Sequence, residues 1–412
     1  MKTEKDVKKP KKKKKWLRPR HRLVRNILFC TLGPFACLKY NARVKKFREQ
    51  GKRSYLVLFN HQTAFDQFFV GLAFRGPVYY LASEDIFSKG LVSSLVRYLV
   101  APIPIKKQTT DVKAIMNCLR VAREGGTIAI APEGNRTYSG KTTSMLPSIA
   151  PLARKMGMPI ALYRLEGGYG VHPRWSDVVR RGKMVGYVSR VIEPEEYATM
   201  TDDELFATIE RELYVDEAVA DATFRHKKSA EYLERTIYVC PTCGLSRFES
   251  HKDRFTCTKC GLEAKYLPTK EFEAVKGDVP FRFVADWYDY QTDFVRQLDL
   301  APYTDTPIYT ERTSFSLVIP YEKKQPLCDL ADVTLYGDRI EVKGKGEDAW
   351  CFHFDAASAV TVLGKNKLNI YADGNIYQLK GDKRFNALKF VHIYHHYHNV
   401  KKGDPHGRLL GL

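Results

Sequence analysis

The chain has 412 residues, 67 of them Lys or Arg and 47 of them Asp or Glu, for a formal net charge of +20. Residues 1–53 carry 20 of the basic side chains and three acidic ones, so the rest is close to neutral, and a uniformly basic nucleic-acid-coating protein is excluded. Hydrophobic residues at 44% and charged residues at 28% exclude a disordered chain and predict two to four globular domains.

The N-terminal segment 1–53 is expected to form a basic tail followed by a helical hairpin that lies in a membrane interface. Its lysine run is too long for the start of a secretory signal. The charge-free stretch 26–38 is about 20 Å long as a helix, too short to span a bilayer. Gly33-Pro34 predicts a break in that stretch, and the spacing of Tyr40, Val44 and Phe47 predicts an amphipathic helix that ends at Gly51.

An anionic membrane surface is the partner that this pattern favours, with the protein peripheral or monotopic on the cytoplasmic face. Two alternatives remain open. The segment could be a solvated basic tail followed by a core helix, or a nuclear-localisation or nucleic-acid-binding tail. The apolar hairpin directly behind the lysines argues for the membrane and against nucleic acid.

Residues 54–235 are predicted to form an α/β domain, with a mixed sheet covered by helices. Short apolar runs alternate with helix-length segments, and this alternation is typical of a sheet with both faces covered. The expected strands are 55–59, 78–82, 101–105, 127–131 and 159–163. The expected helices are 64–75, 110–124 and 144–156, and a charged helix over about 202–235 leads out of the domain.

His61 and Asp66 follow the first of these strands and open a helix. A loop at the carboxyl end of a strand is where α/β sheets place ligands. A carboxylate that holds a histidine fixes its tautomer and stabilises the imidazolium, as a general-base pair requires. Asp66 also fits a helix-capping pattern with Thr63, so capping alone is the alternative.

A second polar block, Ala131–Thr137, follows the 127–131 strand. Gly134 permits a tight turn, Glu133 can accept a hydrogen bond from a hydroxyl group, and Arg136 can bind a phosphate in bidentate fashion. A surface turn with a salt bridge is the alternative for this block taken alone.

The two blocks together resemble the glycerolipid acyltransferase family, whose best-known members are the 1-acyl-glycerol-3-phosphate acyltransferases. The resemblance covers residues 54–200. It implies that His61 and Asp66 are catalytic, and that the acceptor is bound by residues of the other blocks: Asn60, Lys107, Glu133, Gly134 and Arg136. The sequence departs from the family pattern at five positions: Ala131, Asn135 and Thr137 replace Phe, Thr and Ser, Lys107 replaces Arg, and Leu162 replaces a second Pro.

The resemblance implies direct transfer of a fatty acyl group from acyl-CoA or an acyl carrier protein to a hydroxyl of 1-acyl-glycerol-3-phosphate, giving phosphatidic acid. No catalytic cofactor is required. Another lysophospholipid or glycolipid acceptor is the alternative within the same chemistry. A non-catalytic zinc-ribbon protein that binds membranes or nucleic acid is the alternative from a different class.

Four cysteines in the segment 236–268 have the spacing of a metal site: Cys240, Cys243, Cys257 and Cys260. Two C-x2-C pairs separated by thirteen residues predict a zinc ribbon in which four thiolates close the coordination shell, so the zinc is structural. A disulfide pair is the alternative. The other five cysteines are scattered, as in a reducing compartment.

The C-terminal part is predicted as a helical linker over 269–300, with an amphipathic helix at 281–298, and a β-rich domain over 301–412 that closes with a helix at 385–400. Short β runs are expected at 314–319, 333–336, 339–343, 359–363, 367–371 and 375–380, with Asp373-Gly374 as a hairpin turn signal between two of them. The texture of this region, at Leu335–Ile340 and Ile376–Lys380, resembles a PH/GRAM-like domain. The histidines at 392, 395, 396 and 398 could suggest a second metal site. They have no acidic or cysteine partner nearby, so helix packing or surface exposure is favoured.

Overall fold

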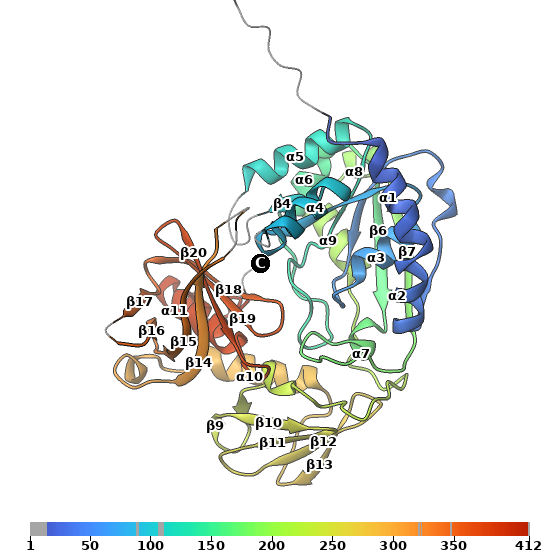
Figure 1. The fold of residues 1–412 in the computed structure, drawn as a ribbon. Coiled ribbons are helices and arrows are strands. Elements are labelled where there is room, and N and C mark those ends of the chain that lie inside the picture. The colour runs from blue at the N-terminus through green and yellow to red at the C-terminus, as the bar shows by residue number, and fades with distance from the viewer. Residues whose placement is uncertain are drawn as a thin grey trace, which may run out of the picture.

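The computed structural model describes residues 15–87, 90–105, 111–319, 322, 324–346 and 348–410. Lys107 and the basic residues 1–14 lie outside the described residues. Along the described chain, a mixed sheet with helices on both faces is followed by a small antiparallel sheet and then by a larger antiparallel sheet (Figure 1).

The first sheet has the strand order β1-β7-β6-β2-β5-β3-β4 in the described residues. Neighbouring strands are parallel except for β6 and β7, which are antiparallel, so the sheet is mixed as expected. Its strands are β1 (Ala42–Val44), β2 (Leu56–Phe59), β3 (Val78–Ser83), β4 (Ile103–Ile105), β5 (Thr127–Ile130), β6 (Ile160–Glu166) and β7 (Met184–Ile192).

Alternate residues of β2 face opposite sides of this sheet, because successive side chains of a strand point to opposite faces. Leu56 and Leu58 pack in one apolar cluster with α5, α6 and α9. Val57 and Phe59 pack in another cluster with α2 and α3. The helices are α2 (Leu32–Tyr40), α3 (Asp66–Ala73), α5 (Val112–Arg123), α6 (Ile149–Met156) and α9 (Asp202–Leu213). Both faces are buried, so every residue of β2 is apolar and buried.

The N-terminal segment forms two helices, α1 (Pro19–Cys30) and α2, but the chain breaks at Thr31 and not at Gly33-Pro34. Pro34 lies in the first turn of α2, where a helix needs no backbone donor. The helix expected over about 39–50 is not formed: α2 ends at Tyr40, Asn41 takes a left-handed conformation (φ 47°), and β1 pairs with β7. Among the described residues, no helix has the length and apolar character needed to cross a membrane.

The charged helix expected over 202–235 is also shorter in the structure. A capping box between Thr201 and Glu204 starts α9, which ends at Leu213. The chain then becomes extended, and the N–H of Val215 donates a hydrogen bond to the Thr142 hydroxyl (2.9 Å). The residues after α9 therefore support the loop that follows the Ala131–Thr137 block.

The cysteine-bearing region forms a two-stranded sheet, β8 (Val239–Cys240) with β9 (Gly244–Leu245), and a four-stranded antiparallel sheet in the described residues. The four strands are β10 (Phe248–His251), β11 (Arg254–Cys257), β12 (Glu263–Tyr266) and β13 (Phe272–Lys276). β13 lies in the segment that was expected to be a helical linker. This part of the segment is a strand because it pairs with β12. The helix of that segment is α10 (Val284–Arg296).

The C-terminal region forms an antiparallel sheet with the order β17-β16-β15-β14-β20-β19-β18 over its described residues, followed by α11 (Leu388–Lys402). The strands are β14 (Tyr309–Leu317), β15 (Gln325–Leu335), β16 (Arg339–Lys343), β17 (Ala349–His353), β18 (Ala357–Leu363), β19 (Lys367–Ala372) and β20 (Asn375–Gly381). Of these, β17 was not expected from the sequence. Asp373-Gly374 forms the β19–β20 turn, while the PH/GRAM-like assignment stays a prediction.

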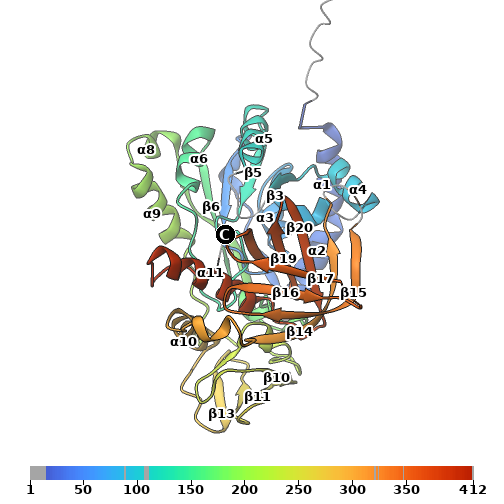
Figure 2. The ribbon, with the colours of Figure 1, turned by 90° about the vertical axis from the view of Figure 1, so that its left-hand side faces the viewer.

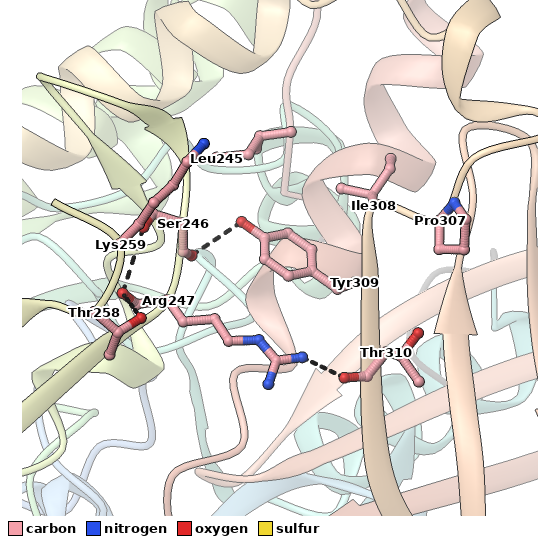
Figure 3. Close-up of a pocket in the computed structure, with 9 residues that line it drawn as sticks. All are labelled: Leu245, Ser246, Arg247, Thr258, Lys259, Pro307, Ile308, Tyr309 and Thr310. Carbon is pink, nitrogen blue, oxygen red and sulfur yellow. Dashed lines mark hydrogen bonds between the residues drawn. The ribbon is translucent and has the colours of Figure 1, made fainter.

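Buried polar contacts fix the cysteine-bearing region against the C-terminal sheet (Figure 3). The Tyr309 hydroxyl lies 3.2 Å from the Tyr238 carbonyl and 3.1 Å from the Ser246 carbonyl, and the Arg247 guanidinium donates to the Thr310 carbonyl. The Trp287 indole N–H of α10 donates to the Val239 carbonyl (2.8 Å). The position of the C-terminal sheet therefore depends on the region that carries the four cysteines.

Candidate active site

The two sequence blocks meet at the carboxyl ends of β2 and β5, which are parallel neighbours in the first sheet. His61 lies in the loop between β2 and α3, and Asp66 is the first residue of α3. The Ala131–Thr137 block follows β5 directly. Because parallel strands end on the same edge of a sheet, the fold brings the two blocks together, as the sequence predicted.

Asp66 holds the imidazole of His61. Nδ1 of His61 lies 2.7 Å from Oδ2 of Asp66, whose side chain is fully buried. The same carboxylate accepts hydrogen bonds from the backbone N–H groups of Gln62 (2.7 Å) and Thr63 (2.9 Å), so capping and histidine positioning coexist in one residue. An ionised carboxylate only accepts, so Nδ1 carries the hydrogen and Nε2 is the basic nitrogen.

Glu133 joins the two blocks through both of its carboxylate oxygens, while its contact with an acceptor hydroxyl stays a prediction. Its Oε1 accepts from the backbone N–H of His61 (2.6 Å), and its Oε2 accepts from the N–H (2.8 Å) and hydroxyl (2.9 Å) of Thr143. The N–H of Thr137 donates to the carbonyl of His61 (3.1 Å). Both backbone groups of His61 are thus held by the second loop. Burial raises the pKa of Glu133 to about 7, although these hydrogen bonds oppose the shift.

Arg136 follows the tight turn at Gly134, whose φ of 64° suits glycine. Nη1 of Arg136 is buried and has no hydrogen-bond partner among the described residues. Burial first, and then the neighbouring Arg174, lowers the pKa of Arg136 to about 10, so the guanidinium remains charged at neutral pH. A buried cation with an unused donor is suited to an anionic ligand.

Asn60 and Lys107 complete the set of residues expected to bind substrate. The Asn60 amide is buried and bonds the backbone of Leu165 through both of its atoms (2.8 Å from Nδ2 and 2.7 Å to Oδ1). It joins the end of β2 to β6, and its role in substrate binding stays a prediction. Lys107 lies outside the described residues.

Two residues that no sequence motif indicated lie beside this site, in the loop after α7 (Gly168–Val171). His172 is only 7% exposed, and its Nδ1 lies 2.8 Å from the Tyr40 hydroxyl, while Nε2 is buried without a partner in the described chain. Arg174 stacks on the Tyr138 ring (4.2 Å) and donates to the Arg136 carbonyl (3.1 Å). A histidine and an arginine in a loop between strands carry no periodic signal, so only the fold could identify them.

The four cysteines form a separate cluster. Their Sγ atoms all lie within 4.8 Å of one another, and the thiols are free. Two pairs, Cys240 with Cys260 and Cys243 with Cys257, are separated by 3.6 Å. Such spacing fits four ligands of one metal ion and excludes the disulfide alternative, because S–S bonds are about 2 Å long.

The C-terminal histidines pack within the protein, as favoured from the sequence. His392 is buried, and its two ring nitrogens lie 2.7 Å and 3.1 Å from the hydroxyls of Tyr238 and Tyr288. Nε2 of His396 lies 2.8 Å from the Leu298 carbonyl. Among the described residues, the four-cysteine cluster is the one group of His, Cys, Asp or Glu side chains suited to a metal.

A family model matches the region that contains the candidate site. Comparison with curated proteins gave no match. Among solved structures, the chain is similar to the 1-acyl-sn-glycerophosphate (LPA) acyltransferase PlsC from Thermotoga maritima, with 22% identity and a TM-score of 0.39, over 47% of this chain and 80% of that one. Residues 40–162 match the model of a family described as Acyltransferase. The matched segment contains His61, Asp66, Glu133 and Arg136, the residues around which the candidate active site is built.

Proposed function

We propose that this protein transfers a fatty acyl group from an acyl thioester, acyl-CoA or acyl carrier protein, to the hydroxyl of 1-acyl-glycerol-3-phosphate. The observation that carries the proposal is the 2.7 Å contact of His61 with Asp66 in the same loop cluster as Arg136, whose buried Nη1 has no hydrogen-bond partner in the described residues. The histidine supplies a general base, and the guanidinium supplies a site for a phosphate. The family match of residues 40–162 supports acyl transfer as the reaction type.

In the proposed mechanism, Nε2 of His61 takes the proton from the acceptor hydroxyl as its oxygen attacks the thioester carbonyl. The carbon–sulfur bond then breaks, and the imidazolium returns the proton to the leaving thiolate, so atoms and charge balance. Asp66 keeps Nδ1 protonated and stabilises the imidazolium. Glu133 fixes the backbone of His61 through its N–H group. No covalent acyl-enzyme is needed.

An acyl-transfer assay tests this function directly. Purified protein is given a panel of lysophospholipids and a monoacylglycerol, each with acyl-CoA and with acyl carrier protein as donor, beside His61→Ala. We expect transfer to 1-acyl-glycerol-3-phosphate and a loss on the order of 10²–10⁴-fold in the variant. Equal activity of His61→Ala and wild type contradicts the mechanism, and preference for another lysophospholipid or a glycolipid acceptor reassigns the substrate.

We further propose that the protein binds an anionic membrane surface from the cytoplasmic side. Apolar side chains on α1, α2 and α4 (Leu91–Leu99) are exposed and form what we call the apolar surface: Leu23, Ile27, Leu32, Phe35, Leu38, Leu91, Val92, Leu95 and Tyr98. The Arg20 side chain joins α1 to α4 through the Tyr98 carbonyl (2.8 Å). Exposed apolar residues beside cationic side chains are typical of an interfacial membrane contact, and both substrate and product are lipids.

Zinc is the metal that we propose for the four cysteines. Tetrahedral zinc–thiolate bonds of about 2.3 Å place sulfur atoms about 3.8 Å apart, close to the 3.6 Å of the two measured pairs. Four thiolates leave no open coordination position, so the ion has a structural role. The cluster lies in the region that fixes the C-terminal sheet, and zinc would stabilise that arrangement.

A further inference from the structure

The β18–β19 hairpin of the C-terminal sheet reaches the loop that carries His172 and Arg174. Figure 1 shows this hairpin on the side of the C-terminal sheet that faces the mixed sheet and its helices, and Figure 2 shows the C-terminal sheet in front of them. At its tip, Nζ of Lys365 donates hydrogen bonds to the Ser176 carbonyl (2.6 Å) and to Oδ1 of Asp177 (2.8 Å). An ammonium group has three donors, so one donor remains beyond these two contacts.

Lys365 lies in the same charged environment as Arg136. Burial lowers the pKa of His172 to about 3, and the charges of Lys365 and Arg136 both add to this shift. Burial also lowers the pKa of Lys365, with Arg136 among the cations that contribute. The contacts agree with this: Lys365 donates to the Ser176 carbonyl, and Arg174 of the same loop donates to the Arg136 carbonyl (3.1 Å), so cations from distant parts of the chain meet at this loop.

The site loop itself is embedded in the C-terminal region. The Tyr138 ring packs in the apolar cluster of the C-terminal sheet and is parallel to the Tyr288 ring of α10, at 6.4 Å between centroids. The guanidinium of Arg174 also stacks on the Tyr138 ring. The loop that carries Arg136 is thus fixed by residues outside the matched segment 40–162.

The cationic side chains around this loop outnumber the carboxylates that pair with them. Asp177 pairs with Lys365 and also with the buried Arg235 (2.8 Å). Among the buried side-chain nitrogens that have no hydrogen-bond partner in the described residues, three belong to this arrangement: Nη1 of Arg136, Nε2 of His172 and Nε of Arg174. Burying charge without a counter-charge is costly, so this arrangement is suited to an anionic ligand.

A purely structural role for Lys365, as an anchor of the hairpin, explains its bonds to Ser176 and Asp177. It does not explain why the neighbouring arginines and His172 retain unused nitrogens at the same place. A ligand with several acceptor oxygens, such as a phosphate group, would satisfy them together.

We propose that the β18–β19 hairpin completes the substrate site and that Lys365, with Arg136 and Arg174, binds a phosphate group of a substrate. This inference rests on the proposed function and extends it, because it assigns substrate binding to the C-terminal region. The phosphate could belong to the lysolipid acceptor or to coenzyme A, and the experiment separates these two sources.

The test uses the full chain as wild type, Lys365→Gln, Lys365→Arg and the control Lys345→Gln, an exposed lysine in the β16–β17 turn. Calorimetric binding of glycerol 3-phosphate and of coenzyme A is measured first, and steady-state KM and kcat follow for each substrate. We expect Lys365→Gln to weaken binding of one phosphate probe by about tenfold or more and to raise the matching KM, with kcat nearly unchanged. Lys365→Arg should retain most of the binding, and the control should match wild type.

The probe that is affected identifies the phosphate source. Unchanged binding of both probes in Lys365→Gln overturns the inference, as does a fall in kcat and melting temperature without a change in either Kd. Acyl transfer by wild type is scored separately. Lys365-dependent binding without any acyl transfer would contradict the proposed function and leave the phosphate site standing.

Discussion

The carboxylate of Glu133 accepts a hydrogen bond from the backbone N–H of His61 at 2.6 Å, and this contact couples the two loops of the candidate active site. The other carboxylate oxygen is held by Thr143. Glu133 therefore fixes the position of His61, the proposed general base, through the backbone of that residue. This role differs from that of Arg136, whose unpartnered Nη1 is suited to the substrate itself.

Glu133→Gln is expected to lower kcat and leave the KM of the acceptor within about twofold. The amide can accept from His61, but its NH2 group then faces the backbone N–H of Thr143, so the loop must shift. A misplacement of about 1 Å costs on the order of 10²-fold in rate. Steady-state kinetics against the control Glu166→Gln, a half-exposed carboxylate at the end of β6, measures the effect. An increase in the KM of the acceptor with unchanged kcat would contradict this role and indicate that Glu133 binds the acceptor directly.

The raised pKa of Glu133 predicts how stability depends on pH. Burial raises the pKa from 4.5 in the unfolded chain to about 7 in the fold, so between these values the folded protein binds more protons than the unfolded one. The favourable contribution is complete below pH 4.5 and is lost as the pH rises to about 7. Urea unfolding of wild type and Glu133→Gln at several pH values measures this effect. The unfolding free energy of wild type should fall relative to that of Glu133→Gln as the pH rises through this range. A difference that is constant with pH would show that Glu133 ionises normally.

Sequence patterns predicted the elements that depend on local chemistry. Buried strands such as β2 read as apolar runs, and the sequence placed His61 and Arg136 each in a loop after such a strand. Only the structure shows that the two strands are parallel neighbours. The N-terminal break was misplaced because Pro34 is tolerated in a first helical turn, and the helix over 39–50 was wrong because β1 pairs with a distant strand, β7. Lys365 could not be predicted as a neighbour of the site, since its contact with Asp177 depends on how two sheets pack.

Removal of the metal is expected to affect stability and the substrate site together. Metal analysis should give one zinc per chain in wild type and in Cys351→Ser, and none in Cys240→Ser or Cys257→Ser. The cysteine-bearing region forms hydrogen bonds with Tyr309 and Trp287. Loss of the metal from this region should therefore lower the melting temperature by about 5 °C or more and weaken acyl transfer. Zinc content equal to wild type in both ligand variants would show that the cysteines are not its ligands.

The apolar surface on α1, α2 and α4 predicts which substitutions weaken membrane binding. Leu38 and Leu91 are 83% and 89% exposed, and burying such a side chain in lipid contributes about 1.5–3 kcal/mol. Leu38→Glu and Leu91→Glu should each weaken binding to phosphatidylserine-containing vesicles about tenfold or more, because the carboxylate opposes both insertion and the anionic surface. Co-sedimentation measures binding, with Val400→Glu as the control because Val400 is 62% exposed on α11. Equal weakening by the control, or steep salt-dependent binding to nucleic acid with none to vesicles, would assign the basic N-terminus a partner other than the membrane.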